Sequence, residues 1–312
     1  MLKILAVVLS LSVACTQGHG NGHGHDHHGD HRHTHNDNHD HSTDSFKITT
    51  IKVEPYYNGN QGYIVDLIKE LQHVMGNFTY QLNEVADGMY GSKIGRRWRG
   101  MIGEVISADA DFAAAPLYIT SRRARVVDFT VPFMKFGLAV LVKKPQNGQL
   151  QITSLSALVR QTTVAYGTLR GGSLPRYLAR SRNSDVRKMY RWMRLNSNRA
   201  YVDNVEEGVR RVMEGNYAFV LEEPFVEYLA HKTPCLMADF SFPADSGIEI
   251  KFGLAFKKGN SHFAHFNDAL KMLKSSGELG HLHHKWFHSG CDSHSHSHHP
   301  GNAHDHDDHH QH

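Results

Sequence analysis

Histidine is the residue type in this chain whose abundance and spacing point most directly to chemistry. The 312 residues include 27 histidines, and most of them lie in two short segments near the ends of the chain. Neutral imidazole is a good ligand for Zn²⁺, Cu²⁺ and Ni²⁺, and a His-x-His pair in an extended segment places both rings on one side. We therefore predict several weak, exchanging metal sites, rather than one defined site, at His23, His25, His27, His28, His31, His33, His35, His294, His296, His298, His299, His304 and His306. The alternative is a pair of solvating tails of low complexity.

The composition of these tails cannot form a buried core, so we expect them to be disordered over residues 19–45 and 293–312. The foldable chain is then about 46–292. A net charge of +3 provides no basic field for nucleic acid, and no nucleic-acid partner is expected. No phosphate loop, nucleophile elbow or zinc-protease helix is present, so the sequence predicts neither an enzyme nor a required cofactor.

The N-terminus carries Lys3, an apolar run over residues 4–14 and small residues up to Gly18, which is typical of a secretory signal peptide over residues 1–18. A buried first strand and a bacterial lipoprotein site at Cys15 are the alternatives. No later segment has 18 consecutive apolar residues, so we expect no membrane span and a secreted, extracellular protein. That compartment favours a disulfide between Cys235 and Cys291 over two free thiols, and it makes Asn77 a candidate for glycosylation.

Strand-like and helix-like segments alternate between these tails, which predicts an α/β fold with mainly parallel sheets. A polar break near residue 145 suggests two lobes. We expect strands over 47–53, 78–85, 111–115, 136–142, 163–166, 217–221 and 252–256, and helices over 62–75, 98–106, 154–161, 204–213, 223–229, 262–273 and 277–286, with one more opening at 171–175.

One continuous stretch carries a specific family pattern. It contains Ala115-Pro116-Leu117-Tyr118-Ile119-Thr120, Ser121-Arg122-Arg123-Ala124-Arg125 and Asp128-Phe129-Thr130-Val131-Pro132-Phe133. Together with Gly62-Tyr63-Ile64-Val65-Asp66-Leu67, Asp87-Gly88-Met89-Tyr90-Gly91, Tyr217-Ala218-Phe219-Val220-Leu221-Glu222 and Lys285-Trp286-Phe287, it resembles the ligand-binding core of ionotropic glutamate receptors, in one order over residues 46–292. The resemblance implies a two-lobed clamshell of the periplasmic-binding-protein type II class, with lobe 1 over 46–138 and 253–292 and lobe 2 over 139–252. It also matches Cys235 and Cys291 to the family's disulfide.

The same resemblance implies an amino-acid site. A zwitterion needs a cation with fork geometry for its carboxylate and an anion for its ammonium group. Arg123 matches the family's carboxylate-binding arginine, although its basic neighbours alone would suggest a solvated stretch. Glu222 matches the amine-binding acid, with an exposed acid at a strand end as the alternative. Ser173 lies where a helix N-terminus suits an oxyanion, and Pro116 joins the predicted ligand set.

Four positions depart from the glutamate pattern. Tyr118 and Leu174 replace threonines, Asn60 replaces an aromatic residue that covers the ligand, and Phe252 replaces a tyrosine. An aliphatic side chain at Leu174 would leave a second carboxylate poorly hydrogen-bonded, so we expect a small or apolar α-amino acid rather than glutamate. Tyr118 could also fill the cleft and abolish binding.

The pore that the family places between its two halves has no counterpart here. Gln146 is followed within a few residues by Ile152-Thr153-Ser154-Leu155, where the second half begins, and a His-rich tail follows Cys291 in place of the last membrane helix. We therefore expect a secreted amino-acid-binding protein that is not a channel, with divalent metal ions as further partners and no identified protein partner. The alternative is an extracellular metal-binding or matrix protein whose clamshell is a scaffold.

Overall fold

The computed structural model describes residues 44–76, 78–145, 152–233 and 236–288. The predicted signal peptide, residues 19–43 and 293–312 of the predicted His-rich tails, Asn77, Cys235 and Cys291 lie outside the described residues, so these predictions stay predictions. Ser45, which was predicted to end the N-terminal tail, instead begins a strand.

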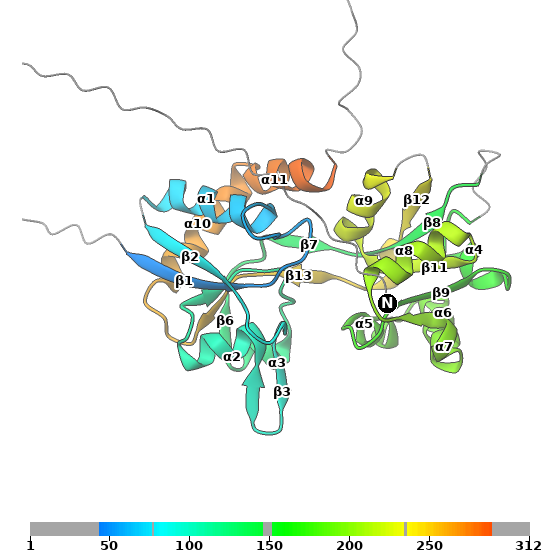
Figure 1. Cartoon of the computed structure of the whole chain (residues 1–312), viewed down its shortest axis with the longest axis horizontal. Coiled ribbons are helices and arrows are strands. Elements are labelled where there is room, and N and C mark those ends of the chain that lie inside the picture. The colour runs from blue at the N-terminus through cyan, green and yellow to red at the C-terminus, as the bar shows by residue number, and fades with distance from the viewer. Residues whose placement is uncertain (1–43, 77, 146–151, 234–235, 289–312) are drawn as a thin grey trace, which may run out of the picture. The chain divides into compact units, whose positions relative to one another are not determined.

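The first of two five-stranded sheets has the order β2-β1-β5-β14-β6. Its strands are β1 (Ser45–Thr50), β2 (Thr79–Glu84), β5 (Phe112–Ala113), β6 (Val127–Phe129) and β14 (Ala255–Lys257). Helices α1 (Tyr63–Met75) and α10 (Phe263–Ser275) cover one face and α2 (Gly100–Ser107) covers the other (Figure 1). Apolar side chains on both sheet faces are buried by these helices, with Ile48 and Leu67 in one cluster and Met101 and Val127 in another. Sheet and helices together form lobe 1.

The second sheet has the order β10-β9-β11-β8-β12. Its strands are β8 (Leu138–Lys143), β9 (Ala165–Leu169), β10 (Tyr201–Val202), β11 (Tyr217–Glu222) and β12 (Met237–Ser241). The central strand β11 alternates: Phe219 packs with the helices α8 (Val205–Glu214) and α9 (Glu223–Lys232), while Val220 belongs to the cluster of α4 (Leu155–Arg160), α5 (Leu174–Arg180) and α6 (Ser184–Leu195). With α7 (Ser197–Ala200), these elements form lobe 2.

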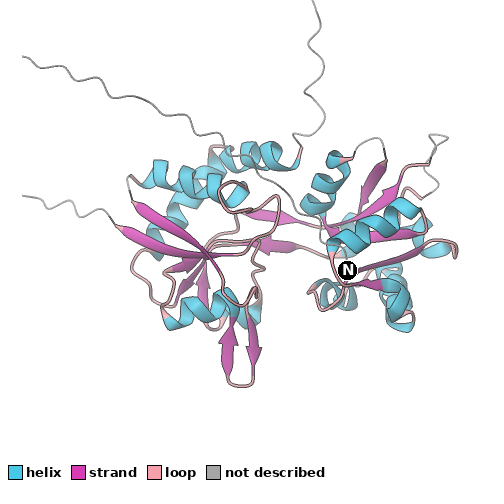
Figure 2. Ribbon diagram, viewed as in Figure 1, coloured by secondary structure: helices cyan, strands magenta, loops and turns pink. Residues whose placement is uncertain are grey.

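Two strands that pass from one lobe to the other, called the crossing strands below, join the lobes. β7 (Met134–Phe136) pairs antiparallel with β13 (Ile250–Phe252), and each continues into a strand of a five-stranded sheet (Figure 2). A helix α11 (Glu278–Phe287) packs on α1 and α10 and also contacts α9 of lobe 2. The two-lobed α/β architecture predicted from the sequence is confirmed by this arrangement.

Three sequence-based expectations were wrong or incomplete. The sheets are not mainly parallel, because β8 and β14, which continue from the crossing strands, each run antiparallel to both of their neighbours. Trp98 lies in β4 (Arg97–Arg99), which pairs with β3 (Ser92–Ile94), and the helix begins only at Gly100. The structure also contains α6, α7, β12, the short helix α3 (Ser121–Ala124) and the 3₁₀ turn η1 (Ala244–Ser246), which the sequence pattern did not predict.

Among the described residues, no helix combines the length and the apolar character needed to cross a lipid bilayer.

Gly208 in α8 permits close packing of that helix on the second sheet. A Cβ atom at Gly208 would lie 2.2 Å from the ring of Phe219, which is fully buried. We expect Gly208→Ala to lower the free energy of unfolding by about 1–3 kcal/mol, because the core has no room for the methyl group. Gly280→Ala in α11 is the matched control: nothing lies within 4 Å of its added Cβ atom, so it should be neutral or stabilising by up to about 1 kcal/mol. Urea unfolding measures both, and equal effects would contradict the packing argument.

Candidate functional site

A cavity of about 410 Å³ lies between the two lobes. Its walls come from the segment between β5 and α3 in lobe 1, and from the end of β11 and the start of α5 in lobe 2. Seven of the eight residues predicted to bind ligand line it, namely Pro116, Tyr118, Arg123, Ser173, Leu174, Glu222 and Phe252.

Backbone carbonyl groups hold the Arg123 guanidinium in the cavity wall and use only part of its hydrogen-bonding capacity. Thr120 caps α3 by accepting a hydrogen bond from the Arg123 backbone N–H at 3.3 Å. The guanidinium donates to the Tyr118 carbonyl from Nη1 at 2.9 Å, and to the Gly91 carbonyl from Nη2 and Nε at 3.2 and 3.4 Å. These bonds leave one N–H on each terminal nitrogen without an acceptor among the described residues. Burial lowers the pKa of Arg123 to about 10, so the group remains charged at neutral pH.

Glu222 ends β11 on the opposite lobe, and its partner is a tyrosine. The Tyr118 hydroxyl donates a hydrogen bond to Glu222 Oε1 across the cavity. Burial raises the pKa of the Glu222 carboxyl, while the bond from Tyr118 opposes that rise. Burial and the neighbouring Glu222 hold the pKa of the Tyr118 phenol well above its usual value, so this hydroxyl keeps its proton. The Tyr118 hydroxyl is therefore hydrogen-bonded to Glu222, the carboxylate that the resemblance assigned to the amine of a ligand.

Aromatic side chains that the sequence analysis did not single out as ligand residues complete the cavity. Tyr56, Tyr90 and Phe225 line it, and the Tyr56 ring lies edge-on to Phe252 with centroids 5.8 Å apart. Burial raises the pKa of Tyr90 to about 12. The segment Asp87-Gly88-Met89-Tyr90-Gly91 belongs to the family-like pattern, and this membership could have indicated that Tyr90 lines the cavity.

Asn60 was predicted to belong to the ligand set, at a position where the family carries an aromatic residue, and it does not line this cavity. It is exposed in the loop before α1 and is absent from the residues that line the cavity. The physical reason lies in the loop itself: Gly62, at φ 136°, packs its α-carbon against the Tyr56 backbone. Tyr56 is thereby placed in the wall.

Ser173 and Leu174 open α5. Ser173 makes no side-chain capping hydrogen bond, and Leu174 is buried in the cavity wall. At this end of the cavity the lobe 2 wall combines the Ser173 hydroxyl with the aliphatic Leu174 side chain, and a second carboxylate at Leu174 would have no side-chain donor from this residue.

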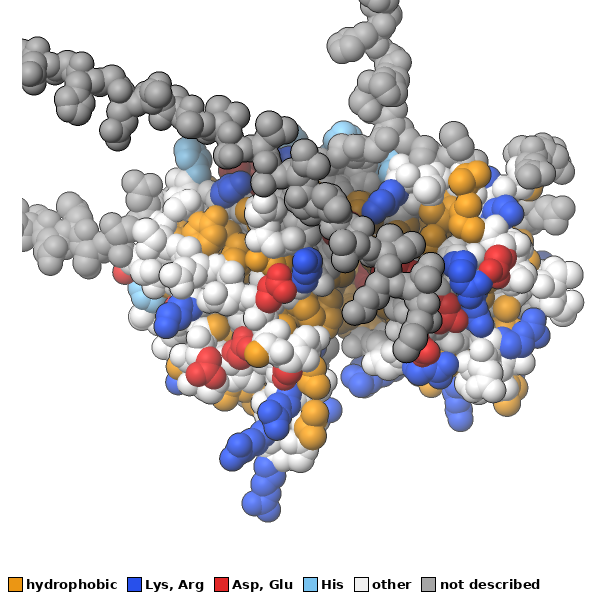
Figure 3. All heavy atoms as spheres, viewed as in Figure 1, with side chains coloured by type: hydrophobic (Ala, Val, Ile, Leu, Met, Phe, Trp, Pro, Cys, Tyr) orange, Lys and Arg blue, Asp and Glu red, His pale blue; other side chains and the backbone are white. Residues whose placement is uncertain are grey.

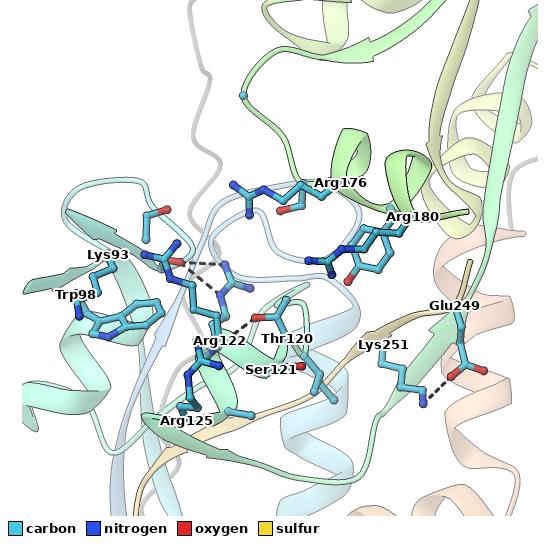
Figure 4. Close-up of a pocket in the computed structure, with 18 residues that line it drawn as sticks. Lys93, Trp98, Thr120, Ser121, Arg122, Arg125, Arg176, Arg180, Glu249 and Lys251 are labelled. Atoms are coloured by element: carbon cyan, nitrogen blue, oxygen red, sulfur yellow. Dashed lines mark hydrogen bonds and ion pairs between the residues drawn. The ribbon is translucent and has the colours of Figure 1, made fainter. Parts of the chain in front are cut away.

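The inner cavity opens into a larger cleft of about 1010 Å³ that also contains Arg123 and Ser173. Its lining is strongly basic, with Glu249 as its single acid. Figure 4 shows Arg122 and Arg125 from the α3 region, with Arg122 beside Trp98, and Arg176 and Arg180 on α5. Basic side chains also gather on the β3–β4 hairpin (Figure 3). Such a field favours the approach of an anion toward Arg123.

Two α/β lobes, two crossing strands and an interlobe cavity with one arginine anchor define a ligand-binding domain of the bilobed clamshell class. Residues 44–146 match the family model described as "Ligated ion channel L-glutamate- and glycine-binding site". The solved structure "Drosophila muscle GluRIIB complex with glutamate" is similar with a TM-score of 0.66 and 32% sequence identity, over 78% of this chain and 99% of that chain. The chain belongs to the family of ionotropic glutamate receptor ligand-binding domains.

Curated relatives agree with this assignment. A "Probable glutamate receptor" of Gallus gallus is 25% identical, over 79% of this chain and 73% of the relative, and one of Anas platyrhynchos is 24% identical, over 78% and 73%. The first alignment spans 362 positions, which exceeds the 312 residues of this chain. That relative therefore carries inserted residues that this chain lacks.

The bond between Tyr118 and Glu222 makes a measurable link between the lobes. In a double-mutant cycle of Tyr118→Phe and Glu222→Gln, we expect a coupling free energy of about 1.5–3 kcal/mol, because the bond involves a charged acceptor. Urea unfolding of the two single variants and the double variant gives this quantity. Strictly additive single effects would show that the two groups do not interact in solution.

Proposed function

We propose that this protein is a secreted binding protein for a small carboxylate ligand of the α-amino acid class. The supporting observation is the Arg123 guanidinium, which is fixed by two backbone carbonyls and still offers one N–H on each terminal nitrogen to the cavity. A carboxylate accepts two such parallel bonds in the geometry that arginine favours.

The other residues that line the cavity restrict which amino-acid side chains would fit. Leu174, Phe252 and Phe225 give the cavity an aliphatic and aromatic lining, which favours a small or apolar side chain over a second carboxylate. The basic cleft outside would raise the local concentration of an anionic group. The lobes would close on the ligand by motion about β7 and β13.

Binding of the amine has a competitor within the protein. The Tyr118 hydroxyl already donates to Glu222, so an α-amino acid must displace this hydroxyl to place its ammonium group on the acid. The ligand therefore gains less from its amine than it would from a free carboxylate, and its affinity depends mainly on Arg123.

We further propose that the chain acts as a binding protein without a pore. Only residues 144–154 lie between the end of β8 and the start of α4, and a membrane-spanning helix needs about 20 residues. Secretion is supported by the signal-peptide pattern of residues 1–18.

A second function is favoured by the same tyrosine. If the Tyr118 hydroxyl holds Glu222 permanently, the clamshell is a scaffold, and the protein is an extracellular metal-binding or matrix protein that acts through its His-rich tails. Neutral imidazoles in these tails would bind Zn²⁺, Cu²⁺ or Ni²⁺ in several exchanging sites.

Calorimetry with a panel of amino acids tests the first function. We expect a small or apolar amino acid to bind at or below millimolar concentration, and Arg123→Ala to weaken it by about 3–5 kcal/mol because a desolvated ion pair is broken. Arg187→Ala removes an exposed arginine that lines neither the cavity nor the basic cleft, so this control variant should bind normally. Absence of binding by the natural chain together with recovery in Tyr118→Thr would identify the tyrosine as the block and favour the scaffold function.

Removal of the tails tests the second function. A chain without residues 19–41 and 293–312 should lose its uptake of multiple zinc or copper ions per molecule, because the clustered imidazoles are gone, while its unfolding transition in the absence of metal stays unchanged. Metal analysis after equilibrium dialysis measures the loss. Undiminished uptake of several ions would place the metal sites elsewhere.

A further inference from the structure

A cluster of one acid and two histidines lies where the two lobes meet through α9 and α11. Glu227 projects from α9 of lobe 2, whereas His283 lies in α11 and His288 directly follows that helix. Glu227 Oε2 lies 3.7 Å from His283 Nε2 and 3.5 Å from His288 Nε2. All three atoms fall within 4.8 Å of one another, and the residues are only partly exposed.

The Glu227 oxygen at the centre of this cluster has no hydrogen-bond donor. Its Oε2 atom is buried and has no hydrogen-bond partner among the described residues. The His283 and His288 nitrogens lie within ion-pair distance of this oxygen, but they attract it as charged groups only when they are protonated. A buried carboxylate oxygen without a donor costs free energy, so such atoms call for a missing partner. The three ligand atoms lie close enough together for one cation to contact all of them.

The two distances from Glu227 are compatible with a zinc ion. Zn²⁺ binds histidine nitrogen and carboxylate oxygen at about 2.0–2.2 Å, and tetrahedral geometry then puts neighbouring ligand atoms about 3.3–3.5 Å apart. The two distances from Glu227 Oε2 lie within a few tenths of an ångström of that separation.

We propose that Glu227, His283 and His288 bind one Zn²⁺ ion that links α9 to α11. This site is separate from the ligand cavity, which none of the three residues lines. It also differs from the tail sites, because its ligands come from two packed helices and are held at fixed separations.

The position of the site predicts its consequence. α9 packs on β8, β11 and β12 of lobe 2, and α11 packs on α1 and α10 of lobe 1. A metal ion shared by these helices would tie the lobes together at a place separate from the connecting strands β7 and β13 and from the Tyr118–Glu222 bond. Bound zinc therefore restricts the relative motion of the lobes and stabilises the folded chain.

Thermal unfolding of the full-length, chelator-stripped protein with and without excess Zn²⁺ tests the proposal. We expect zinc to raise the Tm of the natural chain by roughly 5–10 °C, as for a ligand near a hundred times its Kd in a domain of this size. Glu227→Gln and His283→Gln should each lose most of this shift relative to their own metal-free Tm. His281→Gln and His284→Gln, which alter exposed histidines on the same helix, should keep it.

Hydrogen exchange separates this site from the tails. Zinc should slow amide exchange in α9 and α11 of the natural chain and of the two control variants, and should leave exchange in these helices unchanged in Glu227→Gln. Zinc bound by the tails alone would produce neither effect. The proposal is overturned by a natural chain whose Tm does not respond to zinc, or by a shift that persists in both Glu227→Gln and His283→Gln.

Discussion

The structure depends on placing a positive group and a negative group of two separate sheets on opposite sides of one cavity. Arg123 is fixed on lobe 1 by the carbonyls of Tyr118 and Gly91, and Glu222 is fixed at the end of the central strand of lobe 2. Both groups lose water, and each must therefore find polar partners. Arg123 finds them in the backbone and keeps some donors free, while Glu222 finds a tyrosine hydroxyl from the other lobe.

This difference decides what the cavity can recognise. The Arg123 guanidinium has N–H groups left to donate to a carboxylate. Glu222 already accepts a hydrogen bond from Tyr118, so an amine would have to replace that bond in order to bind. The basic cleft outside the cavity acts at longer range, where it attracts negative charge without selecting among anions. Under the proposed function, recognition would depend on Arg123 for orientation and on Leu174 and the surrounding rings for the shape of the ligand.

Much of this arrangement could be predicted from the sequence, because the motif around Arg123 and the strand ending at Glu222 hold a fixed register along the chain. The bond between Tyr118 and Glu222 could not, since these residues are 104 positions apart and lie on different lobes. The direction of the strands could not be predicted either. Alternating strands and helices indicate a layered α/β fold, but β8 and β14 run antiparallel to their neighbours because they continue from β7 and β13, which connect the lobes. α6 was missed because arginines surround its three buried residues, Val186, Met189 and Met193. Asn60 was wrongly expected at the ligand site, because the order of motifs along the chain does not determine the backbone path of the loop that contains Gly62.

The place of β14 in the first sheet has a consequence for synthesis of the chain on the ribosome. β14 lies between β5 and β6, yet its residues emerge only after every strand of the second sheet has been made. Lobe 2 can therefore complete its sheet while lobe 1 still lacks an internal strand and exposes the edges of β5 and β6. The sheet of lobe 1 therefore stays incomplete until about the last fifth of the sequence has been synthesised. During that time its unpaired strand edges can associate with other chains.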